Sequence, residues 1–132
     1  MEAMVRVGED ELGNPIEVKM KATALVPKLY RFKFGRDMIS DMTALKKAYN
    51  KAESLPEDAT EEEIEEARLS VIDLVLFENC AYIMAKHADS SIPDNPDDWL
   101  DTLPMLSIYA AMPEILKLWQ YNNHTTAIPK KK

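Results

Sequence analysis

Two runs near the N-terminus alternate between hydrophobic and polar residues, the pattern of a β-strand with one buried face. Val5 and Val7 share a face of "MVRV", and hydrophobic residues take every second place in "IEVKMKA", residues 16–22. The turn-rich "GEDELGNP" between the runs predicts a β-hairpin over about residues 4–22. Two strands alone are marginal in water, so we expect the hairpin to lie on helices or to be extended by a partner strand.

Spacings of three and four residues replace the alternation after the hairpin, and they predict helices. A short first helix carries Pro27 in its first turn and ends at Gly35, since glycine enters the left-handed conformation without a Cβ penalty. The second helix docks through one narrow stripe, formed by Met38, Met42, Leu45 and Tyr49. We interpret Gly35 as the hinge between these two helices.

A long third helix is predicted from Thr60 to about Lys86 or Ala88. Thr60 followed by Glu61–Glu63 forms a capping box, with acids at the positive end of the helix dipole. From Val71 onward the helix is hydrophobic almost all round, so we expect its second half to be the buried centre of the fold.

Prolines divide the C-terminal part of the chain. Asn95 and Pro96 start a short helix, Pro104 begins another helical piece, and Pro113 ends or kinks it before the last helix. The sequence therefore predicts a mainly α protein, a compact helical domain of about five helices with a small N-terminal β-hairpin. We expect one domain over residues 1–122 and a flexible tail over residues 123–132, which has neither period nor hydrophobic content.

Composition narrows the classes of protein. The 132 residues are 46% hydrophobic and 30% charged, which is typical of a globular domain, and three glycines are too few for phosphate-binding loops. The single cysteine, Cys80, lies in a hydrophobic run where a buried thiol is expected. That run is shorter than a membrane span, and the N-terminus lacks the hydrophobic region of a signal peptide. We expect neither export nor a membrane partner.

Charge is divided along the chain. Residues 18–51 carry nine bases against two acids, a net charge of +7, whereas residues 53–101 carry two bases against fifteen acids, a net charge of −13. The acidic half would repel a polyanion that the basic half attracts, so we expect no nucleic-acid partner. The two halves either face protein partners or pack against each other. Glu61 to Glu66 form either a solvated first turn or an acidic docking surface.

The sequence contains no motif whose spacing would bring residues together for catalysis or metal binding. His87 and His124 stand in unrelated places, and Cys80 has no neighbouring base to make a thiolate. The aspartates from Asp94 to Asp101 fit helix caps better than a calcium loop, because the segment lacks the mid-loop glycine and closing glutamate of such a loop and Pro96 stands where the loop must stay flexible. We therefore expect no enzyme activity, no cofactor and no metal.

Aromatic residues and arginines dominate binding hot spots, and they gather around Gly35 in "LYRFKFGRDM". Our candidate protein-binding residues are Tyr30, Arg31, Phe34, Arg36, Trp99 and Trp119. The alternative is that Tyr30 and Phe34 pack inward while the bases around them stay in water.

Three segments resemble the tail assembly chaperones of siphophages that infect Gram-positive bacteria. They are "PKLYRFKFGRDMISDM" at residues 27–42, "DDWL" at residues 97–100 and "MPEILKLW" at residues 112–119. The likeness spans Met20 to Tyr121, most of the chain. Met20 can also serve as a start codon, so the sequence leaves open whether the segment before it is needed.

The resemblance implies a small non-enzymatic protein of the host bacterial cytoplasm that is absent from the mature virion. Such proteins bind the tape measure protein, a long helical polypeptide, keep it soluble and help to recruit tail tube protein around it. The alternative is a generic helical adaptor or regulator encoded by a mobile element. Whether the chain forms a homo-oligomer stays open at this stage.

The chain ends in "IPKKK". In phages of the kind implied by the resemblance, a shorter and a longer chaperone are often made from one start by ribosomal frameshifting on an A-rich heptamer. The resemblance therefore predicts such a heptamer in the codons of Lys130 to Lys132, and lysine codons that break the run of adenines would exclude it. The alternative is an ordinary basic tail.

Overall fold

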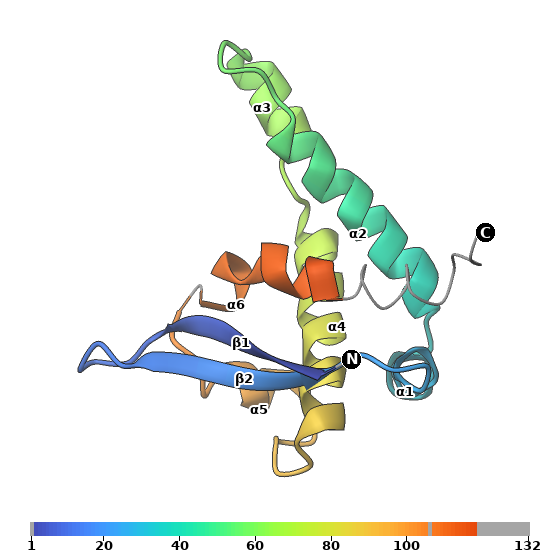
Figure 1. Ribbon diagram of the computed structural model, residues 1–132. Coiled ribbons are helices and arrows are strands. Elements are labelled where there is room, and N and C mark those ends of the chain that lie inside the picture. Colours follow the sequence, from blue (N-terminus) through green and yellow to red (C-terminus); the bar gives the residue numbers. More distant parts are fainter. Residues whose placement is uncertain (1, 106, 119–132) are drawn as a thin grey trace, which may run out of the picture.

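The computed structural model describes residues 2–105 and 107–118. The chain is mainly α-helical with one two-stranded antiparallel hairpin at its N-terminal end, as the sequence predicts (Figure 1). A central helix, α4 at Val71–Ala88, runs through the middle of the molecule. The hairpin and the first two helices of the chain pack against it.

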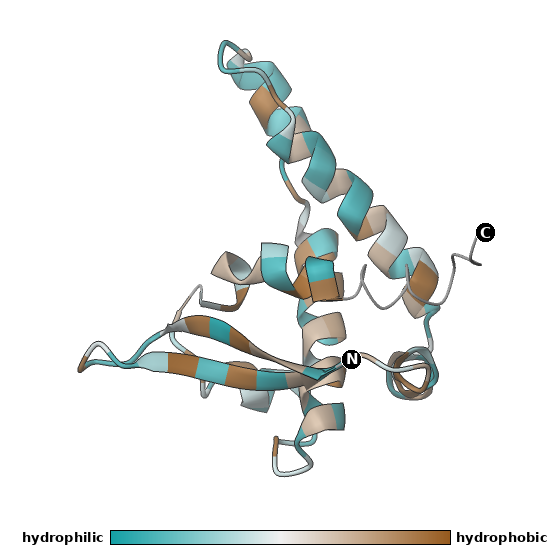
Figure 2. Cartoon of the chain, viewed as in Figure 1, coloured by the Kyte–Doolittle hydropathy of each residue, from teal (hydrophilic) through white to brown (hydrophobic). Residues whose placement is uncertain are grey.

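The hairpin is formed by β1, Glu2–Glu9, and β2, Pro15–Lys21. Hydrophobic and polar residues alternate along both strands (Figure 2), and Val5, Val7 and Met20 point into the core with at most 3% of their surface exposed. Val5 pairs with Val18, and the register shifts by one residue before Glu9 because β1 carries a bulge. The predicted hairpin is confirmed, and its first strand supplies part of the core.

Helix α1, Val26–Phe34, ends at Gly35, whose φ of 68° lies in the left-handed region. The Gly35 N–H donates to the Arg31 carbonyl at 2.8 Å, which closes the last turn. Helix α2, Met38–Glu53, follows at once, capped by the Asp37 side chain. Gly35 is thus the hinge that the sequence predicts, and the stripe of α2 is buried as expected at Met38, Met42 and Leu45.

The prediction of a single helix from Thr60 to Lys86 or Ala88 is wrong, because the structure has two helices there. Its predicted start is confirmed, because Thr60 caps α3, Glu61–Ala67, through a capping box with Glu63. The chain then leaves the helical conformation, and a second capping box opens α4: the Asp73 N–H donates to the Ser70 hydroxyl at 3.0 Å, and the Ser70 N–H donates to the Asp73 carboxylate at 3.0 Å. The capping box at Ser70 competes with continuation of the preceding helix, and it divides the predicted helix into α3 and α4.

The break at Ser70 also shapes the molecule. Helix α2 rises away from the hairpin, and α3 folds back along its far end, so that the two form an arm that projects from the body (Figure 1). The body is built instead around the second half of α4, where the residues from Leu76 to Ala85 are buried except Glu78 and Asn79. The expectation of a buried centre in this half is confirmed.

The C-terminal part contains α5, Pro96–Leu100, α6, Ser107–Ala110, and a helical segment at 112–118. Asn95 caps α5 as predicted, accepting from the Asp98 N–H at 2.8 Å. The helical piece expected from Pro104 starts only at Ser107, and a turn at Ala111 separates it from the helix that carries Pro113. The described residues thus contain seven helical segments where the sequence predicted about five. Trp119 and the tail at 123–132, with Lys130 to Lys132, lie outside the described residues.

Candidate protein-binding groove

A buried carboxylate holds α1 against α2 across the Gly35 hinge. The Tyr30 hydroxyl donates to Asp41 Oδ2 at 2.8 Å, and Arg36 binds both oxygens of the same carboxylate, at 2.8 Å from Nε and 2.9 Å from Nη2. Tyr30 is fully buried, and Asp41 is also buried. The residues that drew attention in the sequence therefore lock two helices together, with Asp41 as the member that sequence reasoning missed.

The pKa values in this cluster follow from its hydrogen bonds. The hydrogen bonds from Arg36 hold the pKa of Asp41 below its ordinary value of 3.8, and burial opposes them only in part. Burial is the largest cause that raises the pKa of Tyr30, and the nearby Asp41 carboxylate adds to it. At neutral pH the cluster therefore contains an ionised Asp41 between a neutral tyrosine and a charged guanidinium.

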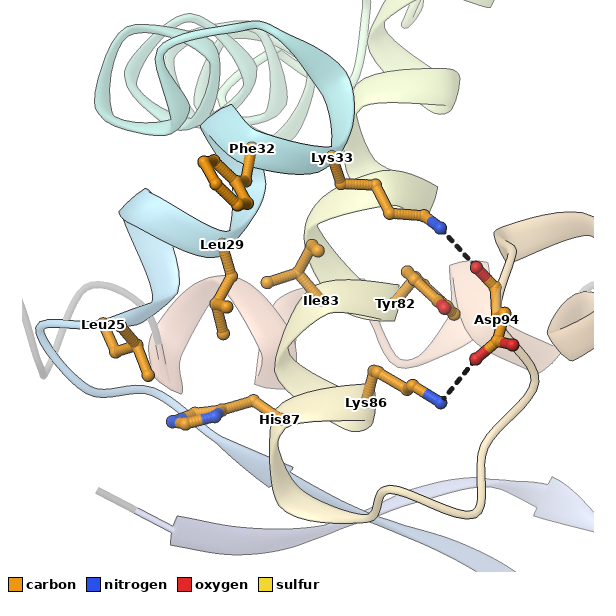
Figure 3. A pocket seen from close by; sticks show the side chains of 9 residues that line it. All are labelled: Leu25, Leu29, Phe32, Lys33, Tyr82, Ile83, Lys86, His87 and Asp94. Atoms are coloured by element: carbon orange, nitrogen blue, oxygen red, sulfur yellow. Dashed lines mark hydrogen bonds and ion pairs between the residues drawn. The ribbon is translucent and has the colours of Figure 1, made fainter.

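Phe32 lies on the opposite side of α1 from Tyr30. Residues i and i+2 of an α-helix point about 200° apart around the helix axis, so a residue two places from a buried one faces outward. Phe32 is 86% exposed, the most exposed aromatic residue in the described chain. Leu29 and Leu25 continue the same side of α1 at spacings of three and four residues (Figure 3). α1 therefore presents a hydrophobic stripe to the surface.

The stripe forms one wall of an open groove, and the last two turns of α4 form the other. Tyr82, Ile83, Lys86 and His87 line the α4 wall (Figure 3). The groove has a volume of about 520 Å³ and a mostly hydrophobic lining. Its volume falls in the range of sites that hold ligands or peptide side chains.

Two lysines at the rim of the groove bind the loop that follows α4. Lys86 donates to the Ser90 carbonyl at 3.0 Å and lies 3.1 Å from the Asp94 carboxylate. Lys33 donates to the backbone carbonyl of Asp94, and its ammonium group lies 5.7 Å from the ring centroid of Tyr82. These contacts tie α1 to the loop between α4 and α5, so the groove has a defined end.

The groove lies in positively charged surroundings. Asp94 is the one acidic residue among the nine described residues that line it, against the bases Lys33 and Lys86, and Lys28 and Arg31 are exposed on the same helix as Phe32. His87 adds no charge at neutral pH, because burial is the main cause that lowers its pKa and Lys21 lowers it further. The groove is thus a hydrophobic trough with a basic rim, suited to an acidic amphipathic segment.

The predicted binding residues are distributed differently from the sequence-based expectation. Tyr30 is in the core, Phe34 is half-buried with its ring centroid 5.0 Å from that of Tyr30, and Arg36 is bound to Asp41. Trp99 is 3% exposed and packs on Tyr82. Arg31 remains at the surface. None of the predicted residues that the structure describes lines the groove, whereas Phe32 does. The offset of two residues from Tyr30 is the signal that identifies Phe32.

A free cysteine and potential metal ligands are the other candidate chemistry in the part of the chain that the structure describes. Burial raises the pKa of the Cys80 thiol, as expected for an inert core cysteine. Residues 2–105 and 107–118 contain no group of three or more potential metal ligands. Within the same residues, no helix is long and hydrophobic enough to cross a membrane.

Comparison of the chain with protein-family models, with curated proteins and with solved structures gave no match. The function is therefore inferred from the groove, the charges around it and the sequence resemblance.

Proposed function

We propose that this protein is a non-enzymatic chaperone of phage tail assembly that binds helical segments of the tape measure protein. The observation that carries the proposal is Phe32, which stands 86% exposed at an open hydrophobic groove between α1 and α4. Large exposed aromatic side chains beside a hydrophobic groove are typical anchors for a partner, because their burial contributes most of the binding energy.

An amphipathic helix suits the shape and charge of this groove. The stripe formed by Leu25, Leu29 and Phe32 has the spacing of a helical face, so a client helix lying along it can place its own residues i, i+4 and i+7 against it. Burial of Phe32 alone contributes about 2 kcal/mol at the usual value per unit of hydrophobic area. Acidic residues flanking the hydrophobic face of the client would meet Lys28 and Arg31.

In the proposed role the protein acts in the host bacterial cytoplasm during tail assembly. It covers the hydrophobic faces of the tape measure protein until the tail tube protein replaces it, and it is absent from the mature virion. The sequence resemblance supports this choice of client, and the groove supports the mode of binding.

Co-expression tests the proposal. The full chain, produced together with the tape measure protein encoded beside it, should raise the soluble fraction of that protein and co-purify with it. Phe32→Asp should reduce co-purification at least tenfold, because a carboxylate replaces the anchor and repels acidic flanks. Leu12→Asp is the matched control, since Leu12 is equally exposed at 86% but lies in the hairpin turn. Equal loss with both variants, or with neither, would refute the role of the groove.

A helical adaptor of a mobile element is the second candidate function, and it uses the same groove for a different partner. It predicts that Phe32→Asp abolishes binding to some other helical protein while the tape measure protein stays insoluble with or without the chain.

A further inference from the structure

β2 has an edge that faces away from β1. Within residues 2–105 and 107–118 the sheet has two strands, so each of them is paired with another described strand on one side alone. Among the described residues, no backbone hydrogen bond joins β2 to an element other than β1. A hollow of about 340 Å³ runs along this edge: the consecutive residues from Ile16 to Lys19 form one wall, and residues between Asp89 and Leu103 form the other. Neighbouring residues of a strand belong to opposite faces, so a hollow that all four line lies at the edge of the strand, and Glu17 and Lys19 are exposed there.

The backbone groups on this edge can be assigned from the turn. The Asp10 N–H donates to the Asn14 carbonyl at 2.9 Å, so residue 14 points its backbone toward the first strand. In an antiparallel ladder alternate residues face the same neighbour. Ile16, Val18 and Met20 therefore point their N–H and C=O groups at β1. Glu17 and Lys19 point theirs away from it, toward the hollow.

The charges on this edge are complementary to the same strand turned around. Glu17 and Lys19 are exposed and stand on either side of Val18. If two copies of β2 run antiparallel with Val18 opposite Val18, each Glu17 stands opposite the other copy's Lys19. In this register the outward N–H and C=O groups of Glu17 in one copy also face those of Lys19 in the other. The two residues can then form a hydrogen-bonded pair of an antiparallel ladder, which exchanges two hydrogen bonds.

We propose that β2 is a self-association site, through which two copies of this chain join their hairpins into one four-stranded antiparallel sheet centred on Val18. The partner is a second copy because the sequence of the edge is its own complement about Val18. The two-fold arrangement is closed, so it yields a dimer and no filament. None of the four residues from Ile16 to Lys19 lines the α1–α4 groove, and the proposal does not depend on the proposed function.

Charge reversal gives the sharpest test, with sedimentation velocity of the full chain from 5 to 500 µM as the measurement. The natural protein should dimerise in this range. Glu17→Lys places lysines opposite lysines, and Lys19→Glu places glutamates opposite glutamates, so each variant should dimerise at least tenfold more weakly. An equimolar mixture of the two variants should recover the dimer, because each variant is then opposite its complement.

Matched controls reverse the same charges on the projecting arm. Glu57→Lys and Lys51→Glu alter the net charge by the same amounts at exposed positions far from β2 in the chain, and they should leave the dimer unchanged. A natural protein that stays monomeric at 500 µM overturns the proposal and leaves the edge open to a foreign strand. So does a dimer that ignores both edge variants, or a mixture that fails to recover the dimer.

Amide hydrogen exchange of the natural protein supplies a test that needs no variant. The Glu17 and Lys19 amides should exchange quickly in dilute protein and become protected as the concentration rises. The Val18 and Met20 amides should be protected throughout, since they face β1. Protection of Glu17 and Lys19 that is independent of concentration would overturn the proposal.

Discussion

Asp41→Ala removes the buried carboxylate that joins Tyr30 to Arg36, and its cost can be worked from the contacts. The Tyr30 hydroxyl is fully buried and loses its acceptor, which costs about 1–3 kcal/mol. The side chain of Arg36 is 53% exposed and regains water, so loss of its ion pair costs at most about 1 kcal/mol more. We expect the free energy of unfolding to fall by about 3 kcal/mol.

Equilibrium urea unfolding measures this loss, with Asp58→Ala in the exposed loop between α2 and α3 as the control within about 0.5 kcal/mol of the natural protein. The double variant Tyr30→Phe with Asp41→Ala separates the causes. Since phenylalanine leaves no orphaned hydroxyl, the double variant should be no less stable than Asp41→Ala alone. A loss below about 1 kcal/mol for Asp41→Ala, or full additivity in the double variant, would refute the reasoning.

The same carboxylate predicts a pH dependence. The pKa of Asp41 in the folded protein lies below its ordinary value of 3.8, so the native state favours the ionised form. The stabilisation from Asp41 is therefore fully present above the unfolded pKa and is lost as the pH falls through the folded pKa. The stability difference between the natural protein and Asp41→Ala should be constant from pH 7 down to about pH 5 and should shrink below about pH 4.

Three further outcomes are expected. Ser70→Ala should lower the free energy of unfolding by about 1 kcal/mol by removing the cap of α4, while Ser40→Ala on the exposed face of α2 should change it by less than about 0.5 kcal/mol. The raised pKa of buried Cys80 means that a thiol reagent at pH 8 should label the native protein no faster than it unfolds, and rapid labelling would show that the thiol is accessible. A chain that starts at Met20 lacks Val5 and Val7 from the core and should show no cooperative unfolding transition by circular dichroism, whereas an unchanged midpoint would show that the first strand is dispensable.

Local sequence signals were enough to predict the elements in which the capping residues and the hydrophobic periodicity indicate the same bounds. The stripe of α2, the Asn95 cap and the Gly35 hinge were all predicted, because each depends on residues within one or two turns. The break before α4 was missed although Ser70 and Asp73 have the spacing of a capping box, since the hydrophobic pattern continues across it. The capping box at Ser70 starts a new helix, although the hydrophobic periodicity alone fits one long helix.

The groove was less predictable than the helices that form it. Phe32 and Leu29 are close in the chain, and their common side follows from the helical period. Ile83 and Lys86 come from a helix far away in sequence, so their position opposite α1 depends on tertiary packing. The role of Asp41 was also hidden, because its partners Tyr30 and Arg36 lie beyond a turn that changes the direction of the chain.

The projecting arm has a practical consequence for work on this protein. Its tip, residues 54–60, joins α2 to α3 at a distance from both the hairpin and the groove (Figure 1). Exposed loop tips tolerate inserted residues well, because few contacts depend on their backbone. A fluorophore or an affinity peptide inserted there would report on the molecule during assembly while leaving both candidate contact surfaces unobstructed.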